Sequence, residues 1–238
     1  MVKEDGLWPG GPRFYFDDAL FLPSTDSFLL GAFPRLHRGE RVCDLGSGTG
    51  LLGLLLAARC EGLSLTNVEL DPRAAALSRE SYARNGLAAQ HLTADLRDPG
   101  QLPGRECFDL VISNPPYFAP ERGAVAEGAR GVARSSGCTV EELCRAAGRL
   151  LRYGGRFALI FRTERMAELF CGLRAEKLEP KRLRMIQNTA ASAPSLFLLE
   201  CKKGGGCGLI AEPPLLLRDE RGEETADVRH AYFREKEA

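Results

Sequence analysis

The chain has 238 residues, of which 44% are hydrophobic and 27% charged, as is ordinary for one globular domain with a substantial core. Its 32 Lys and Arg balance its 32 Asp and Glu, so no global charge attracts phosphate, and a nucleic-acid partner would need locally gathered basic residues. The apolar run Leu51–Ala58 is far too short to span a bilayer, and Met1–Gly6 lacks a signal-peptide pattern, so we expect a cytoplasmic protein without membrane contact.

The eight cysteines are scattered along the chain and form no C-x-x-C pair. Cys43, Cys60 and Cys171 fall in apolar segments, which predicts reduced core thiols instead of disulfides or zinc ligands. The three histidines are isolated in the sequence. We therefore expect no metal site and no nucleophile–base dyad.

In chain order, Phe14, Phe16 and Phe21 predict a short N-terminal strand or hairpin that packs on the main sheet. Strands and helices then alternate, which predicts a single α/β domain. The expected strands are Arg41–Leu45, Ser64–Leu70, Ala89–Ala94, Phe108–Ser113, Arg156–Phe161, Arg182–Gln187 and Leu196–Cys201. The expected helices are Leu51–Arg59, Pro72–Arg84 with an Asn85-Gly86 stop, a helix from Thr139 to Gly154-Gly155 with a Thr139/Glu142 capping box, Glu164–Leu178, and a charged terminal helix on the outside.

A glycine-rich turn follows the first long strand, in Asp44-Leu45-Gly46-Ser47-Gly48-Thr49-Gly50. Glycines let the backbone approach a ligand closely, and the N-terminus of the next helix favours negative charge. Nicotinamide and flavin binders also carry glycine turns, but here the spacing is Gly-x-Gly-x-Gly, and an acid precedes it. We predict that a cofactor contacts Asp44, Gly46, Ser47, Gly48 and Gly50.

Acids also end the next two strands. Glu69 lies where a ribose diol would be held by paired hydrogen bonds, and Asp95 is placed to accept from an adenine amino group. The adjoining Leu70 and Leu96 are included in the predicted cofactor site. The structural alternative is that these acids cap turns or lie solvated at strand ends.

The fourth strand, Phe108–Ser113, runs into Asn114-Pro115-Pro116-Tyr117. Two prolines cannot continue a strand ladder, so the chain leaves the sheet in a rigid extended turn. This places an amide, two outward-facing carbonyls and an aromatic ring at the carboxyl end of a strand, where open α/β sheets bind ligands. A planar group that carries an amino nitrogen fits there: Asn114 and Pro115 accept its N–H bonds, and Tyr117 stacks on it.

The same acceptors have a chemical role. The amino nitrogen of adenine or of an amide is a poor nucleophile, because its lone pair is delocalised. Two acceptors out of the plane favour a pyramidal nitrogen and stabilise the positive charge that develops during attack. We predict Asn114, Pro115, Pro116 and Tyr117 as the catalytic set, with Asn114 also near the cofactor, and no strong base is needed.

Together these motifs resemble the S-adenosylmethionine-dependent class I methyltransferases, in the branch with an Asn-Pro-Pro-Tyr signature. Phe21–Phe33 further resembles the lead-in of the bacterial tRNA(Val) adenine-N6 methyltransferases, which modify the adenine beside the anticodon of a valine tRNA. In those relatives a Thr-Asp pair opens a helix over the cofactor, which implies cofactor contacts by Thr25 and Asp26 and an N-cap at one of them.

The resemblance implies a Rossmann-like fold with a seven-stranded, mostly parallel sheet, an antiparallel last strand and helices on both faces. Residues 1–39 would form an N-terminal extension with the cofactor-covering helix, 40–203 the core and 204–238 a C-terminal turn and helix. It implies S-adenosylmethionine as the cofactor, S-adenosylhomocysteine as its product, an RNA substrate such as tRNA, and a monomer or weak dimer.

One segment departs from the family. The relatives have Ala-Arg-His-Glu after the Asn-Pro-Pro-Tyr signature, where this chain has Ala133-Arg134-Ser135-Ser136, so a different RNA or substrate class stays open. In the loop after the signature, we predict that Tyr117, Phe118, Arg122, Arg130 and Arg134 contact the substrate. Further basic candidates are Lys181, Arg182, Arg184, Lys202 and Lys203.

Four other functions remain open from the sequence. Methylation of a protein glutamine amide fits the signature equally well, but such enzymes usually carry a helical domain before the core. Guanine-N2 methylation of ribosomal RNA and adenine methylation of DNA rank lower. The fourth is a cofactor- or RNA-binding module without turnover, against which the intact set Asp44, Glu69, Asp95 and Asn114–Tyr117 argues.

Overall fold

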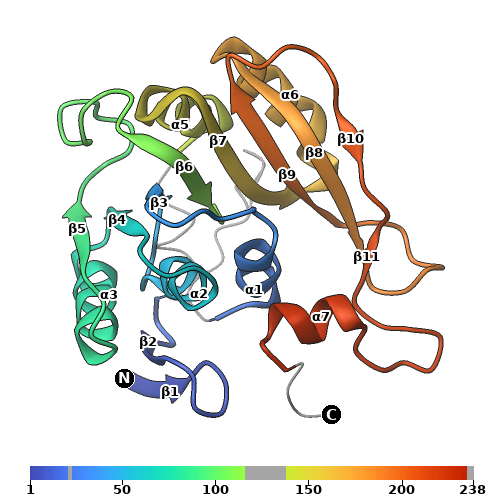
Figure 1. Ribbon diagram of the computed structural model, residues 1–238, viewed down its shortest axis with the longest axis horizontal. Helices are drawn as coiled ribbons and strands as arrows, with labels where there is room; N and C mark the ends of the chain where they lie inside the picture. Colours follow the sequence, from blue (N-terminus) through green and yellow to red (C-terminus); the bar gives the residue numbers. More distant parts are fainter. Residues whose placement is uncertain (21–22, 116–137, 235–238) are drawn as a thin grey trace.

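The computed structural model of the chain describes residues 1–20, 23–115 and 138–234. A nine-stranded sheet crosses the molecule, with helices on both faces (Figure 1). Apart from two short strands at one edge, the strands follow the order β5-β4-β3-β6-β7-β9-β8. They are β3 (Arg41–Leu45), β4 (Ser64–Glu69), β5 (Ala89–Thr93), β6 (Phe108–Ser113), β7 (Leu151–Arg162), β8 (Leu178–Gln187) and β9 (Leu196–Lys203).

The pairing confirms the expected class of fold. The strands from β5 to β7 pair in parallel, and β9 lies antiparallel between β7 and β8. Two strands of two residues each, β10 (Ile210–Ala211) and β11 (Leu215–Leu216), add to β8 and were not expected. Such short strands carry no periodicity that a sequence pattern can reveal.

The helices cover the sheet in two groups. On one face lie α1 (Thr25–Ala32), α2 (Leu51–Arg59) and α3 (Pro72–Arg84), whose apolar side chains share a core with Val42, Leu110 and Ile112. On the other lie α5 (Val140–Leu150) and α6 (Met166–Ala175). The expected Thr139/Glu142 capping box opens α5, and Asn85 ends α3 with Gly86 at a φ of 65°.

Two boundaries differ from the expected ones. The helix α5 ends at Leu150, and the expected stop at Gly154-Gly155 lies inside β7, where the register with β6 shifts after Phe108. A Cβ at Gly155 would lie 2.9 Å from the Arg152 carbonyl oxygen. Glycine therefore allows the close backbone contact in this irregular pairing and does not mark the end of a helix.

The helix and the strand that follow β7 also have bounds that differ from the expected ones. A 3₁₀ turn (η1, Thr163–Arg165) precedes α6, which ends at Ala175, and β8 begins at Leu178 instead of Arg182. The pairing of β8 with β9 has an irregularity between Pro180 and Arg182, and this places a proline inside the strand. Proline normally argues against a strand, which explains the late expected start.

The N-terminal residues form a hairpin of β1 (Val2–Gly6) and β2 (Arg13–Asp17), but its location was predicted wrongly. The hairpin is a separate sheet that packs on α3. The Tyr15 backbone N–H donates to Ser81 Oγ at 2.9 Å, and Asn85 exchanges hydrogen bonds with the Arg13 backbone at 2.8 and 2.7 Å. Phe14 is buried in the α2 and α3 side of the core, whereas Phe21 lies outside the described residues.

The last helix, α7 (Ala226–Ala231), lies beside α1 on the outside of the fold (Figure 1). The Tyr232 ring stacks on Phe28 at 4.2 Å, and its hydroxyl donates to Thr25 Oγ1 at 2.9 Å. Phe233 stacks on Trp8 of the N-terminal hairpin at 3.8 Å. The C-terminal residues therefore fix α1, the helix that comes before the glycine turn.

Candidate active site at the carboxyl edge of the sheet

The parallel strands bring three of the predicted acids and the Asn-Pro turn to one edge. Val68 of β4 lies beside Leu45 of β3, and Ile112 of β6 lies beside Asp44. Because neighbouring parallel strands end at the same edge, the segments that follow β3, β4, β5 and β6 meet there.

The glycine turn is held against the tip of β4. The backbone N–H groups of Gly46 and Ser47 both donate to the Val68 carbonyl, at 2.9 and 3.0 Å. Gly46, Gly48 and Gly50 all have positive φ, with Gly50 at 85° as the N-cap of α2. The turn therefore needs glycine for its backbone conformation.

Asp44 is 1% exposed, and neither of its carboxylate oxygens has a hydrogen-bond partner among the described residues. Burial raises the pKa of Asp44 to about 8, and the negative charge of Glu69 adds to this rise. The nearby backbone N–H of Gly53 opposes the rise, although it does not form a hydrogen bond with Asp44. Ser47 Oγ and Thr49 Oγ1 are also buried and have no partner within the part of the chain that the structure describes. Buried polar groups normally have hydrogen-bond partners, so these oxygens indicate that a bound ligand supplies the missing partners.

Glu69 joins the glycine turn to the end of β4. Its Oε2 accepts from the Gly48 N–H at 2.7 Å, and its Oε1 accepts from the Asp71 N–H at 2.8 Å. Burial raises the pKa of Glu69, and these amides oppose the rise. Leu70 beside it is 44% exposed, an apolar side chain open to a ligand, whereas Asp71 caps α3 by accepting from the Arg73 N–H.

Asp95 has a partner that the sequence did not indicate. Its carboxylate forms an ion pair with Arg97, at 2.6 Å between Nη2 and Oδ2, and the hydrogen bonds from Arg97 lower its pKa. Leu96 packs against the core beneath. The role of Asp95 toward an adenine amino group stays a prediction.

Asn114 follows β6 and lies against α1. The hydroxyl of Ser113 donates to the Leu45 carbonyl at 2.7 Å, which ties the end of β6 to that of β3. Asn114 Nδ2 donates to Ser27 Oγ at 3.0 Å, and Pro115 is buried. Outside the described residues lie Pro116, Tyr117, Phe118, Arg122, Arg130, Arg134 and the Ser135-Ser136 departure.

The first turn of α1 differs from the expectation. Its N-cap is Ser24, not Thr25 or Asp26, and the Ser24 side chain makes no capping hydrogen bond. Thr25 instead bonds to Tyr232, and Asp26 lies in the first turn. Ser27 was not among the predicted site residues. Its signal is helical spacing, since Ser27 precedes the buried Leu30 and Gly31 by three and four residues and so shares their face.

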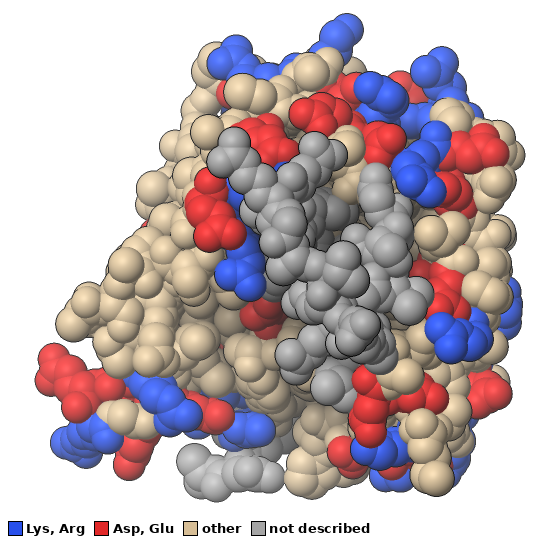
Figure 2. Space-filling model, turned by 180° about the vertical axis from the view of Figure 1, so that it is seen from behind, with Lys and Arg blue, Asp and Glu red and all other residues tan. Residues whose placement is uncertain are grey.

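Most of the basic candidates in the second half of the chain are engaged by other groups, so they do not form a free patch for phosphate. On the face drawn in Figure 2, Lys and Arg are interspersed with Asp and Glu around the grey residues. Lys202 is exposed. The remaining four basic residues have partners: Arg182 pairs with Glu200 and Glu212, Arg184 with Asp227, and Lys203 with Glu106, whereas Lys181 donates to the carbonyls of Gly206 and Cys207.

The cysteines are free; Cys43 is buried and Cys60 half-buried, but Cys171 is exposed, so its assignment to the core was wrong. Within the described ranges, no group of three or more His, Cys, Asp and Glu is arranged to hold a metal ion. None of the helices in those ranges combines the length and apolarity that crossing a bilayer requires.

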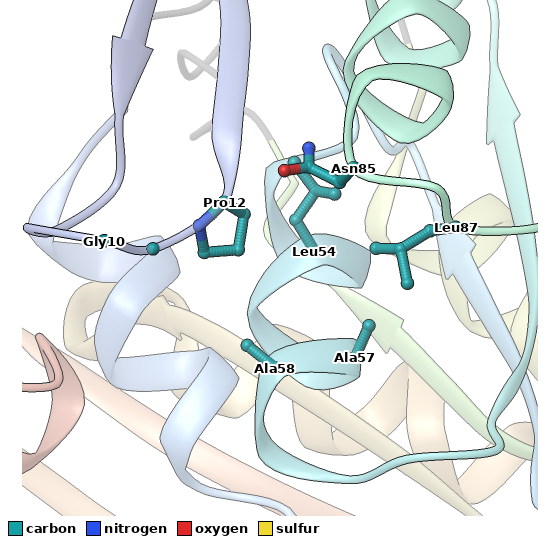
Figure 3. A pocket seen from close by; sticks show the side chains of 8 residues that line it. Gly10, Pro12, Leu54, Ala57, Ala58, Asn85 and Leu87 are labelled. Carbon is teal, nitrogen blue, oxygen red and sulfur yellow. The ribbon is translucent and has the colours of Figure 1, made fainter.

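A cavity of about 320 Å³ lies elsewhere, between the N-terminal hairpin, α2 and the end of α3 (Figure 3). It is lined mainly by backbone and small apolar groups, and none of the predicted site residues borders it. The lining residues are Gly10, Gly11, Pro12, Leu54, Ala57, Ala58, Asn85 and Leu87.

Known proteins resemble this chain over most of its length. The family model of the methyltransferase small domain matches residues 24–171. A tRNA1(Val) (adenine(37)-N6)-methyltransferase from Dickeya chrysanthemi is 33% identical over 205 residues, which is 82% of this chain and 80% of that protein. The enzyme of the same name from Parabacteroides distasonis is 29% identical, over 78% of each chain.

Solved structures share the fold. A predicted O-methyltransferase from Agrobacterium tumefaciens superposes with a TM-score of 0.72 at 23% identity, over 87% of this chain and 96% of that one. A T. thermophilus 16S rRNA methyltransferase, solved with AdoMet and guanosine, gives a TM-score of 0.58 at 22% identity, over 85% of this chain and 50% of that one. With the family model spanning the glycine turn, the strand tips and the Asn-Pro turn, the chain belongs to the methyltransferase small domain family.

Proposed function

We propose that the protein is an S-adenosylmethionine-dependent methyltransferase that modifies the N6 amino group of an adenine in tRNA. The specific target is the adenine beside the anticodon of a valine tRNA. The observation that carries the proposal is the position of Asn114, which follows β6 at the same edge as Asp44, a buried acid without a hydrogen-bond partner among the described residues. The names of the relatives from Dickeya and Parabacteroides support the choice of substrate.

The described residues fit this cofactor. S-adenosylmethionine carries a sulfonium and an ammonium group and supplies an electrophilic methyl group. Among the described residues, the buried Asp44 carboxyl group has no cation or donor beside it and the Ser47 and Thr49 hydroxyls have no hydrogen-bond partner. A positively charged, polar ligand would compensate for the burial of these groups. Glu69 has two acceptor oxygens with lone pairs beyond the two amide bonds, which suits a ribose diol. Leu70 offers apolar surface for a ring.

The chain's own contribution to transfer is electrostatic and positional. Asn114 Nδ2 is engaged by Ser27, so Oδ1 is the atom available to accept from the substrate amino group. Accepting this N–H stabilises the positive charge that grows on the nitrogen during attack. The Ser113–Leu45 bond and the buried Pro115 hold the turn in place on both sides of Asn114. The proton can leave after transfer, so no strong base is needed.

Other substrates have less support from the comparisons. A protein glutamine amide also presents an amino nitrogen, but the names of the relatives from Dickeya and Parabacteroides give an adenine of tRNA as their substrate. Guanine-N2 methylation has a fold relative in the 16S rRNA enzyme, at 22% identity only. DNA adenine and a binding module without turnover have no specific observation in their favour. RNA is therefore the proposed partner, and the cytoplasm, where tRNA is found, is the proposed location.

The test supplies tritiated S-adenosylmethionine to the purified protein with unmodified bulk tRNA, ribosomal RNA, DNA and release-factor protein in parallel. Nucleoside analysis then identifies the labelled product. We expect label in N6-methyladenosine from tRNA. Label in guanosine or in protein would show that the substrate is a guanine base or a protein and not a tRNA adenine. Label in none of the four substrates would contradict the proposal.

A further inference from the structure

Phe233, two residues after the end of α7, contacts two flat groups from distant parts of the chain. Its ring stacks on Trp8 of the N-terminal hairpin at 3.8 Å, and the Arg59 guanidinium carbon lies 4.1 Å from the ring centre. Arg59 ends α2, and its Nη2 also donates to two carbonyls of α7, at 3.0 and 2.9 Å. These contacts dock residues 226–234, the C-terminal segment, on the hairpin and on α2.

The backbone at Phe233 is unusual for so large a side chain. Its φ is 59°, in the left-handed region that favours glycine. The Phe233 N–H donates to the His230 carbonyl at 3.2 Å and the Arg234 N–H to the Arg229 carbonyl at 2.9 Å, which is the pattern of a helix cap that normally uses glycine. The contacts of the aromatic ring therefore offset a strained backbone.

Tyr232 joins the same segment to α1. Its ring stacks on Phe28 at 4.2 Å, with 11° between the ring planes, and its hydroxyl oxygen lies 2.9 Å from Thr25 Oγ1. The Arg234 guanidinium carbon lies 4.7 Å from the centre of the Tyr232 ring. The C-terminal segment thus contacts the first turn of α1 through both a ring and a hydroxyl.

The first turn of α1 depends on such outside contacts. The helix has only eight residues, and the side chain of its N-cap, Ser24, makes no capping hydrogen bond within the described ranges. Helices this short are stabilised mainly by packing. The other end of α1 is held separately, because the Arg182 guanidinium carbon lies 4.4 Å from the centre of the Phe33 ring. Tyr232 therefore gives the N-terminal end of α1 the support that a cap would give.

The same turn of α1 borders the candidate active site. Ser27 Oγ lies 3.0 Å from Asn114 Nδ2. Thr25 and Asp26, the cofactor contacts predicted from the sequence, are the first two residues of the helix. A displacement of this turn would move these groups relative to the carboxyl edge of the sheet.

We propose that Tyr232 is a positioning residue for the cofactor site, where the C-terminal segment holds the first turn of α1 in the conformation that binds S-adenosylmethionine. The inference rests on the proposed function, which places the cofactor beside this turn. A turn that is fixed in advance loses less freedom when the ligand binds, so the ligand binds more tightly. By linkage, a bound cofactor stabilises the docked C-terminal segment by the same factor.

The first test measures this reciprocal effect in the wild-type protein. Hydrogen exchange is followed at the Tyr232 and Arg234 backbone amides, which donate to carbonyls of α7, with and without saturating S-adenosylhomocysteine. We expect exchange at both amides to slow about three- to tenfold, the equivalent of one aromatic stack or one hydrogen bond. The control is the Glu212 amide, which donates to the Leu183 carbonyl at the edge of the sheet. Unchanged exchange at the two amides, or equal slowing at Glu212, would overturn the inference.

The second test measures the Kd for S-adenosylhomocysteine by calorimetry in variants of the full chain. Tyr232→Leu removes the stack and the hydroxyl, and we expect the Kd to rise about three- to tenfold. Tyr232→Phe keeps the ring and should recover most of the affinity. The matched control is Tyr153→Leu, because the Tyr153 hydroxyl also makes one hydrogen bond, to the Gly204 carbonyl at 3.1 Å, but near the opposite end of β7 from the site. A wild-type Kd in Tyr232→Leu contradicts the positioning role.

Phe233→Gly keeps the test independent of a general loss of folding. Glycine relieves the strained φ at this position while it removes the ring. Trp8 is the single tryptophan of the chain, so its fluorescence emission reports the loss of the stack. We expect the emission to shift and the Kd for S-adenosylhomocysteine to rise together. Shifted emission with an unchanged Kd would overturn the inference.

These outcomes separate the inference from the proposed function. If S-adenosylhomocysteine binds and slows exchange at Tyr232 and Arg234, but tRNA is not methylated, the proposed substrate fails and the positioning role stands. If it binds without this effect, the positioning role alone fails. If it does not bind to the wild type, both fail.

Discussion

The backbone N–H of Gly48 donates to Glu69 Oε2 at 2.7 Å, so the acid at the end of β4 holds the middle of the glycine turn. The turn is thereby fixed from two directions, since Gly46 and Ser47 also bind the Val68 carbonyl. Glu69 has two tasks in this arrangement: it shapes the turn and, in the proposed function, it accepts from the ribose of the cofactor.

Replacing Glu69 with alanine tests both tasks. Glu69→Ala removes the acceptor for the Gly48 and Asp71 amides together with the proposed diol contact. We expect the Kd for S-adenosylhomocysteine, measured by calorimetry, to rise by about 10- to 100-fold, the equivalent of one or two hydrogen bonds to a charged group.

The matched control is Asp71→Ala, two residues further on. It removes the N-cap of α3, which lowers the free energy of unfolding by about 1 kcal/mol, but it keeps the backbone N–H that Glu69 binds. Cofactor affinity is expected to stay within about threefold of wild type. If Asp71→Ala weakened cofactor binding as much as Glu69→Ala, cofactor affinity would depend on the stability of the fold and not on the diol contact.

Asp44 makes stability depend on pH. Its pKa is raised from 3.8 to about 8 in the folded protein, so between these values the folded state holds a proton that the unfolded chain releases. The free energy of unfolding therefore falls as pH rises from about 4 toward 8, and then levels off. Glu69, whose pKa is also raised, contributes in the same direction.

Thermal unfolding of the wild type and Asp44→Asn between pH 5 and 9 measures this effect. The variant is expected to flatten most of the pH dependence and to be more stable than the wild type at pH 8. It should also bind S-adenosylmethionine more weakly, because the cation loses its carboxylate partner. The same pH profile in the wild type and in Asp44→Asn would mean that Asp44 is already ionised in the unliganded protein.

The contact between α2 and α3 allows no side chain at Gly53. A Cβ there would lie 1.9 Å from the Tyr82 hydroxyl oxygen, so Gly53→Ala destabilises the fold by about 1–3 kcal/mol despite the better helix propensity of alanine. Urea unfolding should show that adding Tyr82→Phe recovers part of this loss. Gly206→Ala, whose Cβ would have no atom within 4 Å, is expected to stay within about 0.5 kcal/mol.

Asn114→Ala separates chemistry from cofactor binding. The variant removes the acceptor that stabilises charge on the substrate nitrogen, and we expect kcat to fall on the order of 100-fold or more. The Kd for S-adenosylhomocysteine should change by less than about threefold, because Asp44 and Glu69 are untouched. Normal turnover by this variant, measured with tritiated cofactor, would rule out the acceptor mechanism.

Much of this architecture is predictable from local sequence signals. The bounds of β3, β6, α2 and α3 match the expected ranges, because glycine, proline and the Asn85-Gly86 stop mark their ends. The fold class follows from the alternation of strands and helices, and the carboxyl-edge position of Asp44, Glu69 and Asn114 follows from parallel pairing.

Local sequence signals do not reveal contacts between residues that lie far apart in the sequence. The hairpin was expected on the sheet, but its partners Ser81 and Asn85 lie more than sixty residues away, in α3. The Ser27–Asn114 bond spans 87 residues, and nothing in either segment encodes the other. The Asp95–Arg97 pair is local, but the choice between a solvated acid and an ion pair depends on side-chain placement.

The most direct measurement of the central claim uses transcripts of a valine tRNA with either adenine or guanine beside the anticodon. Each is incubated with tritiated S-adenosylmethionine and either the wild type or Asn114→Ala, and the nucleosides are separated. We expect label as N6-methyladenosine only when the wild type meets the adenine transcript. Label that survives the guanine replacement, or that Asn114→Ala transfers at the wild-type rate, would contradict the account.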